Sequence, residues 1–399
     1  MQNVVRLHVT SRGEAVANAK IIQLSPQEVE LGITDEDGLL TVWWEVGTPV
    51  VLQVVPYAGS WDGIFPVDDL PVPTDPSQAI LVSLELEALP LDANPWWHPG
   101  GGNDQAGHGL RIGIVDTGSG PHPALDRIVL AGAWIRGVWG KGVEGYDCER
   151  HGTHVSGIIA ARALENGAMC GLASAATTVS IRVASRSDNG KLRLTNGDIA
   201  TAIDSLVNDH SVDLLNLSLG GEGFDSDENE ALQFAIENGT LPLAAAGNHA
   251  HIHYPAAYEG VVAVGALGRW GEGSRHCREG FYVLEQERGD APPPELFIPD
   301  FSLYEDPVDC FSAGVEIVST VPEIAGFPAP YAAMTGSSMA VAVVTGLLAR
   351  ALGNDEVYPT LPRTKNRTDR ARALLYGILR MRETLGGVER KVAIPERPA

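Results

Sequence analysis

Three short segments, far apart but in a fixed order, constrain this 399-residue chain more than any other feature. They read Gly-Ile-Val-Asp-Thr-Gly at 113–118, His-Gly-Thr-His-Val at 151–155 and Gly-Ser-Ser-Met-Ala at 336–340. They supply a carboxylate at Asp116, which ends an apolar strand-like run, and an imidazole and a hydroxyl that each begin a helix-like run, at His151 and Ser338. Open α/β sheets gather such groups at the carboxyl ends of their strands, so the segments predict an α/β fold.

From Leu110 onward the chain alternates strand-like and helix-like runs, as a parallel sheet with crossover helices requires. Continuous apolar runs are typical of strands covered on both faces; they are Arg111–Val115, Thr178–Val183, Val212–Leu217, Leu241–Ala245 and Val261–Val264. Helical periodicity covers Asp198–Asn208, Asn229–Asn238 and Ser338–Leu352. We therefore predict an α/β domain at 110–352, a parallel sheet flanked by helices, with an irregular charged insertion at 265–314.

The first 88 residues predict a separate, small all-β sandwich domain. Short runs rich in β-branched residues alternate there with turn sequences; they are Val4–Thr10, Ala19–Leu24, Val29–Ile33, Leu39–Glu45, Val50–Val55 and Ile80–Leu86. Residues 89–109, rich in proline, glycine and tryptophan, predict a linker. Residues 353–399 predict a basic C-terminal tail with one amphipathic helix, Ala371–Arg382, that docks on the α/β domain.

Composition and charge exclude several classes of partner. The net charge of −23 repels a phosphate backbone, so we expect no nucleic-acid partner. No run reaches the ~18 apolar residues of a membrane span, and the N-terminus lacks a signal-peptide pattern. We therefore expect a cytoplasmic protein with no membrane partner. The four cysteines, at 148, 170, 277 and 310, match no zinc pattern and are expected to be thiols.

The order of acid, base and nucleophile separates families that share this chemistry. Asp116, His151 and Ser338 follow the subtilisin order, and the chain resembles the subtilisin-like serine peptidases (subtilases) over roughly 110–350. The resemblance implies a serine endopeptidase, a hydrolase in which Ser338 is the nucleophile, His151 the base and Asp116 the group that orients the imidazole. It implies no required cofactor. Calcium binding is an alternative that no sequence motif supports, and the metal ligands are unknown.

Two further segments match the family. Asn248, after a strand-like run, is implied as an oxyanion donor through its side-chain amide, together with the backbone N–H of Ser338 at a helix N-terminus. Another segment matches the family's strand that pairs with the substrate main chain; it consists of Ser218, Leu219, Gly220 and Gly221. The far wall of the same pocket is implied to be Ala246 and Gly247.

The first 88 residues do not resemble a subtilase propeptide; they resemble carboxypeptidase-regulatory-like or transthyretin-like β domains. Without such a propeptide, we expect restricted processing of a protein or peptide substrate, with room for an activating or inhibitory protein partner. Two alternatives stay open. One is a catalytically silent subtilase-fold scaffold or binding protein, and the other is an esterase or acyl transferase that uses the same triad.

The sequence also supports expectations for an acidic run, three histidines, Cys148 and His154. The acidic run Glu222–Glu230 predicts a solvated loop, with calcium binding or a preference for basic substrates as alternatives. Three alternating histidines lack the carboxylate or cysteine that would complete a metal site; they are His249, His251 and His253. Cys148, near His151, is expected to be a buried inert thiol rather than a redox group. His154 is expected to be a buried structural histidine.

Overall fold

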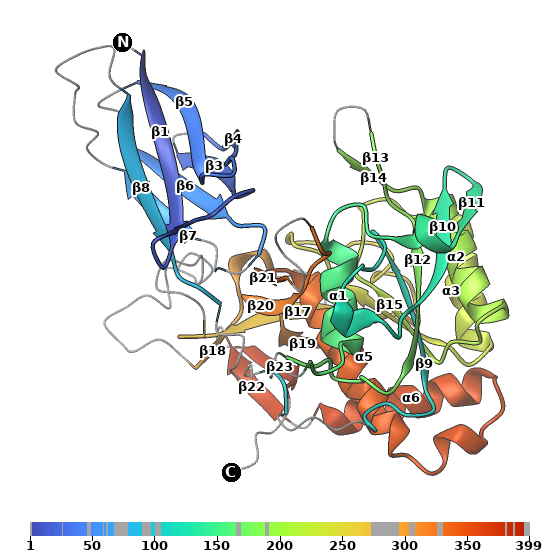
Figure 1. Ribbon diagram of the computed structural model, residues 1–399. Coiled ribbons are helices and arrows are strands. Elements are labelled where there is room, and N and C mark those ends of the chain that lie inside the picture. Colours follow the sequence, from blue (N-terminus) through green and yellow to red (C-terminus); the bar gives the residue numbers. More distant parts are fainter. Residues whose placement is uncertain are drawn as a thin grey trace. The chain divides into compact units, whose positions relative to one another are not determined.

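The computed structural model describes residues 2–25, 27–45, 49–58, 60, 63–67, 79–89, 97–99, 105–164, 169–187, 191–272, 295–302, 308–324, 330–379, 381–385 and 388–394. The chain forms two compact units, one made mainly of residues 1–90 and the other mainly of residues 91–399 (Figure 1). The predicted bounds 1–88, 89–109, 110–352 and 353–399 stay predictions.

The N-terminal unit consists of two four-stranded sheets. In one sheet β1 pairs with β2, β5 and β8, and in the other the order is β4-β3-β6-β7. Side chains from both sheets form one core. Three of them, Leu7, Ile21 and Leu52, are 0% exposed. The strands are β1 Gln2–Ser11, β2 Glu14–Ala15, β3 Lys20–Ser25, β4 Val29–Ile33, β5 Leu39–Glu45, β6 Val50–Val55, β7 Gly63–Val67 and β8 Ile80–Leu86.

The six strands expected in this unit are present, and the sequence missed the short β2 and β7. β7 contains Gly63 and Pro66, which weaken the composition signal of a strand.

The second unit is built on one large sheet, ordered β11-β10-β12-β9-β15-β16-β17-β19-β23-β22, with β18 paired to β17. Neighbouring strands from β10 to β23 run parallel. The strands are β9 Arg111–Asp116, β10 Val129–Ile135, β11 Val138–Lys141, β12 Thr177–Arg182, β15 Leu214–Leu217, β16 Leu241–Ala245, β17 Val262–Arg269, β18 Leu296–Phe297, β19 Cys310–Ala313, β22 Met381–Leu385 and β23 Val388–Ala393; the short strands β13 Ser185–Arg186, β14 Leu192–Arg193, β20 Ile317–Thr320 and β21 Tyr331–Met334 lie outside it.

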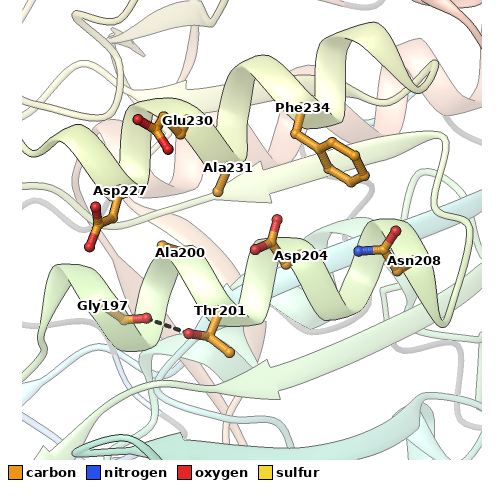
Figure 2. Close-up of a pocket in the computed structure, with 9 residues that line it drawn as sticks. All are labelled: Gly197, Ala200, Thr201, Asp204, Asn208, Asp227, Glu230, Ala231 and Phe234. Carbon is orange, nitrogen blue, oxygen red and sulfur yellow. Dashed lines mark hydrogen bonds between the residues drawn. The ribbon is translucent and has the colours of Figure 1, made fainter.

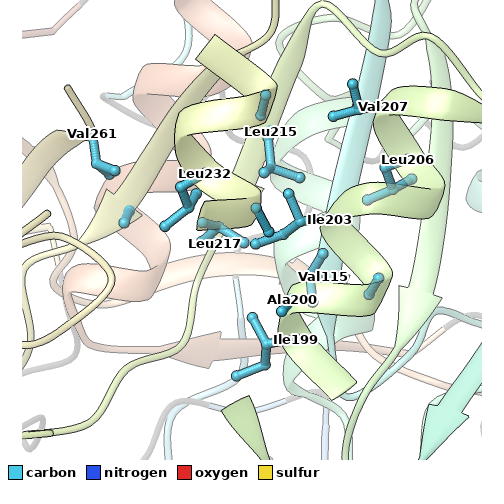
Figure 3. Close-up of a cluster of buried hydrophobic side chains, with 14 of the residues drawn as sticks. Val115, Ile199, Ala200, Ile203, Leu206, Val207, Leu215, Leu217, Leu232 and Val261 are labelled. Carbon is cyan, nitrogen blue, oxygen red and sulfur yellow. The ribbon is translucent and has the colours of Figure 1, made fainter. Parts of the chain in front are cut away.

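Helices cover both faces of this sheet (Figure 1). Leu215 and Leu217 of β15 pack in a core with residues of α2 and α3 (Figure 3). Side chains alternate along a strand, so Asn216 faces the other side, where its Oδ1 accepts a hydrogen bond from Thr345 of α5 at 3.0 Å. The helices are α1 His151–Ala160, α2 Asn196–Asn208, α3 Ser226–Glu237, α5 Ser337–Gly353 and α6 Lys365–Ile378.

The predicted C-terminal helix Ala371–Arg382 was wrong at both ends. The helix α6 spans Lys365–Ile378 and is followed by the hairpin β22–β23, which joins the large sheet beside β19. The sequence signals for a hairpin were present, since two alternating runs flank a Gly-Gly pair. Docking of the helix on the α/β unit is confirmed, because Ala371 and Leu375 are buried and α6 contacts α5 and α3.

The predicted insertion 265–314 was too wide. β17 continues to Arg269, and Cys310–Ala313 forms β19, an inner strand of the sheet. The apolar character of these strands was obscured by the charged sequence between them, of which residues 273–294 and 303–307 lie outside the described residues.

A buried ion cluster fixes the C-terminal segment to the sheet. The Asp213 carboxylate is 2% exposed and accepts hydrogen bonds from the backbone N–H of Arg111 at 2.9 Å and from Arg363 at 3.1 Å. It also lies 2.9 Å from a guanidinium nitrogen of Arg367. One carboxylate therefore ties β9 to the segment that carries α6.

Asp213→Ala is expected to lower the free energy of unfolding by about 3–5 kcal/mol, because it leaves partly buried guanidinium groups without a counter-charge. Urea unfolding followed by circular dichroism measures the change. The exposed Asp209→Ala, four residues earlier, is the control and should stay within about 0.5 kcal/mol of the parent. Equal effects of the two substitutions would contradict this role of Asp213.

Candidate active site

The acid and the imidazole predicted from the sequence are in direct contact. Asp116 is the last residue of β9 and is 2% exposed. Its Oδ1 lies 2.8 Å from Nδ1 of His151, the first residue of α1, and also accepts a hydrogen bond from the backbone N–H of Thr117 at 2.6 Å. This contact fixes the ring by its Nδ1 side and leaves Nε2 for a second partner.

The contact shifts the titration of the imidazole. Burial lowers the pKa of His151, but the charge of Asp116 and its hydrogen bond outweigh burial and raise the pKa above its ordinary value of 6.5. Gly152 permits the close approach, because a Cβ there would overlap the carbonyl oxygen of Gly118 and lie 3.0 Å from Oδ1 of Asp116. A larger residue at 152 would push α1 away from the carboxylate.

A second carboxyl, Asp147, holds the Asp116 turn against α1. Its Oδ1 accepts a hydrogen bond from Thr117 Oγ1 at 2.8 Å, and its Oδ2 accepts bonds from the backbone N–H and the hydroxyl of Thr153 at 2.8 and 2.6 Å. Thr117 Oγ1 in turn accepts from the N–H of Gly152 at 2.8 Å. Burial raises the pKa of Asp147, against these hydrogen bonds. No motif in the sequence singled out Asp147.

The hydroxyl of Ser338 lies in the first turn of α5 and is linked to the end of β15. Its Oγ donates to the carbonyl oxygen of Ser218 at 3.2 Å, and Ser218 Oγ donates to the carbonyl oxygen of Ser338 at 2.9 Å. Ser338 therefore lies beside the strand that borders Asp116 in the sheet. Among the described hydrogen bonds, Ser338 Oγ donates to the carbonyl oxygen of Ser218, and none connects it to His151.

The side chain of Asn248 is oriented by the start of α5. Its Oδ1 accepts hydrogen bonds from the backbone N–H and the hydroxyl of Ser337, each at 3.0 Å. The amide oxygen faces both donors, so the NH₂ group points elsewhere. Ser337 Oγ also accepts from the N–H of Gly247 at 3.2 Å. In the sequence, Ser337 is merely the residue before Ser338 in the segment 336–340. In the structure, its backbone N–H and its hydroxyl hold the side chain of Asn248.

The remaining predicted substrate residues lie at two places. One group lines a cavity of about 600 Å³ that also reaches Asp116 and His151: Ser218, Leu219, Gly220 and Gly221. Gly221 pairs with Tyr254 through two backbone hydrogen bonds of 2.8 and 2.9 Å. Ala246 is buried and Gly247 half-buried, and neither lines this cavity. A Cβ on Gly247, at φ +104°, would meet the ring of His253 at 3.0 Å.

The prediction of a solvated loop at Glu222–Glu230 was wrong for its second half. Asp225 caps α3 by accepting a hydrogen bond from the N–H of Glu228 at 3.0 Å, and the helix begins at Ser226. Glu228 is 3% exposed and lines the cavity described above. The capping pattern of Asp225 with an acid three residues later was the sequence signal for this helix start.

A second cavity, of about 580 Å³, lies between α2 and α3 (Figure 2). Its acidic side chains, Asp204, Asp227 and Glu230, come from both helices. Within the described ranges, no three histidine, cysteine, aspartate or glutamate side chains gather as a metal site would require. None of the helices in those ranges is long and apolar enough to cross a membrane.

The structure also describes the other histidines and the cysteines for which the sequence supported predictions. His154 is confirmed as a buried histidine: it is 0% exposed and its Nε2 lies 2.8 Å from the carbonyl oxygen of Ile317. Cys148 is half-buried, and burial raises the pKa of its thiol, which disfavours a reactive thiolate. The rings of His249 and His253 stack at 5.3 Å. Cys148 and Cys310 are free thiols, Cys170 Sγ lies 3.6 Å from Nε2 of His98, and Cys277 lies outside the described residues.

Comparison with known proteins finds relatives of this chain. The model of the subtilase family matches residues 107–375. An intracellular serine protease of Paenibacillus polymyxa is 29% identical over 283 residues, covering 69% of this chain and 76% of that protein. The major intracellular serine protease of Bacillus subtilis (strain 168) is 29% identical over 289 residues, covering 67% and 79%.

Two further matches are a relative and a solved structure. A thermophilic serine proteinase of Bacillus sp. (strain AK1) is 31% identical over 254 residues, covering 60% of this chain and 51% of that protein. A solved structure titled S41 Psychrophilic Protease superposes with a TM-score of 0.54 at 24% identity, covering 69% of this chain and 84% of that chain, which supports the fold. The chain belongs to the subtilase family and is a subtilisin-like serine peptidase.

Proposed function

We propose that this chain is an endopeptidase that cleaves peptide bonds through a triad of Asp116, His151 and Ser338 and an acyl-enzyme intermediate. The observation that carries the proposal is the 2.8 Å contact between a buried carboxylate and the Nδ1 of an imidazole, at the edge of the sheet where Ser338 is anchored. This arrangement fixes the imidazole tautomer that can accept a proton at Nε2.

In the proposed mechanism, the Ser338 hydroxyl leaves its hydrogen bond to Ser218 when a substrate carbonyl is bound. It then attacks the carbonyl carbon while His151 Nε2 accepts its proton. Asp116 stabilises the imidazolium that forms, and His151 passes the proton to the leaving amine. Water, deprotonated by His151, then hydrolyses the acyl-enzyme and regenerates Ser338.

The oxyanion is proposed to bind between the Asn248 amide and the backbone N–H of Ser338. Two observations support this assignment. The Ser337 bonds hold the Asn248 oxygen, which leaves its NH₂ group as a donor. The N–H of Ser338 lies in the first turn of α5, where the helix dipole favours negative charge, and none of the described hydrogen bonds uses it as a donor.

Asn248→Ala is expected to lower kcat by about 10²–10³ with little change in KM, because an oxyanion donor acts mainly in the transition state. Steady-state hydrolysis of a fluorogenic peptide measures both constants. Asn208→Ala, an exposed amide on α2, is the control and should retain the parent values. A rise in KM at unchanged kcat would show instead that Asn248 binds substrate uniformly.

Restricted processing of a protein substrate is part of the proposal, as is a cytoplasmic location, which is supported by the two relatives named as intracellular proteases. The comparison of matched peptide, ester and amine-acceptor substrates separates an endopeptidase from an esterase or acyl transferase. A chain that turns over none of these, while unreactive to fluorophosphonates, would be the silent scaffold.

A further inference from the structure

The cavity that begins at Asp116 and His151 has a buried carboxyl in its wall. Its apolar lining includes Leu192, Leu194 and Leu219, and Glu228 contributes the carboxyl. Glu228 is 3% exposed, so the group is largely removed from water although it lines an open cavity. A carboxylate in such a place is costly unless a cation or several donors approach it.

Among the described residues that line this cavity, all the charged side chains are acidic except the catalytic imidazole. Its ionisable side chains are the carboxyls of Asp116, Glu149 and Glu228, the imidazole of His151 and the phenol of Tyr254, and it includes no lysine or arginine among the described residues. The field within the cavity therefore favours a cationic side chain over a neutral or anionic one.

The hydrogen bonds of Glu228 leave room for a new donor. Its Oε2 lies 3.0 Å from the hydroxyl oxygen of Tyr258. That hydroxyl already accepts from the N–H of Asp225 at 2.9 Å, and it lies 2.9 Å from the carbonyl oxygen of Asp225. A phenol has one proton for these two acceptors, whereas a carboxylate has about four lone-pair sites. Glu228 therefore retains acceptor capacity after its contact with Tyr258.

We propose that this cavity is a subsite for a basic substrate side chain, lysine or arginine, whose cation pairs with Glu228. The aliphatic stem of such a side chain lies against the leucine walls while its charged end reaches the carboxylate. The proposal rests on the endopeptidase function and names its substrate class: peptides with a basic residue a few positions before the scissile bond, where the main chain runs along Ser218–Gly221.

The preference is expected to depend on pH. Burial raises the pKa of Glu228 to about 7, against the hydrogen bond from Tyr258, and the charge of Asp225 adds to the rise. The other ionisable groups of the cavity are Glu149, Tyr254 and the Asp116–His151 pair. Helix α2 contributes the uncharged Asn196 and Ile199 to the lining. Above its pKa Glu228 is an anion and attracts a cation; below it the carboxyl is neutral. Discrimination should therefore be largest at alkaline pH and fall toward pH 6.

The test compares matched peptides that carry lysine, methionine or glutamate at the second, third or fourth position before the scissile bond. At pH 8 the parent enzyme should show kcat/KM for lysine about tenfold or more above methionine at one position, the size expected of one charge-assisted hydrogen bond. Glu228→Gln should bring this ratio to within about twofold of one. Glu230→Gln removes the same charge two residues along α3, beside the other cavity (Figure 2), and should keep the parent ratio.

Two further measurements separate the possible failures. Leu194→Arg, at a side chain that is 40% exposed, adds a cation to the cavity wall and should lower the lysine preference without touching the α3 cap. Calorimetric binding of the same peptides to Ser338→Ala should show the same order of affinities without requiring turnover. Lysine and methionine within twofold at all positions, or equal effects of Glu228→Gln and Glu230→Gln, would overturn the subsite. Failure to cleave any of these peptides, together with failure to react with a fluorophosphonate, would instead overturn the endopeptidase function.

Discussion

Asp116→Asn is expected to lower kcat on peptide substrates by about 10⁴ while leaving the fold intact. An amide in place of the carboxylate cannot stabilise the imidazolium of His151, and its NH₂ group favours the wrong tautomer at the 2.8 Å contact. Steady-state kinetics with active-site-titrated protein measures the loss. Asp126→Asn, an exposed carboxylate of the same unit, is the control and should retain parent activity.

The same variant tests the pKa of the base. Because Asp116 raises the pKa of His151 above 6.5, the imidazole of the parent becomes protonated and unable to accept a proton as pH falls through that raised value. The acidic limb of parent activity should therefore lie above pH 6.5, and in Asp116→Asn it should move to lower pH. An unmoved limb would mean that another group controls it.

Ser338→Ala is expected to lower kcat by about 10⁴ or more, because the residual binding and oxyanion contacts cannot replace the nucleophile. The fold should tolerate the change, since among the described hydrogen bonds the Ser338 hydroxyl takes part only in the 3.2 Å bond to the carbonyl oxygen of Ser218. Hydrolysis of a fluorogenic peptide at high enzyme concentration measures the residual activity.

Ser337→Ala is the matched control, one residue earlier on the same helix. It removes one of the two bonds to Asn248 Oδ1 and keeps the one from the backbone N–H, so a loss nearer tenfold is expected. If Ser337→Ala abolished turnover and Ser338→Ala did not, the proposed roles of the two hydroxyls would be wrong.

The parts of the fold that could be predicted are those with strong local periodicity. Strands β9, β15 and β16 are largely apolar runs, and their carboxyl ends deliver Asp116, Ser218 and Asn248 to one region. Local sequence sets such elements because both faces of the sheet are covered by helices. The contact of Asp116 with His151 was implied by the order of the motifs and the resemblance to the family, since neither residue alone specifies its partner.

The features that escaped prediction depend on contacts between distant residues. In the sequence, Glu228 is one acid in a charged run. In the structure it is buried where α3 packs against Tyr258, whose hydroxyl it contacts. The hairpin β22–β23 reads as part of a basic tail, and its place is set by pairing with β19. Asp147 is distinguished by bonds to Thr117 and Thr153 on two different segments. Local composition does not encode such tertiary pairings.

The most direct test of the catalytic centre is the reaction of the full-length protein with a fluorophosphonate, read by intact mass and then by mapping the labelled peptide. The geometry predicts one adduct per chain, on Ser338, that disappears in Ser338→Ala and is strongly slowed in Asp116→Asn. An adduct on another residue, or labelling that survives in Ser338→Ala, would contradict the proposed triad.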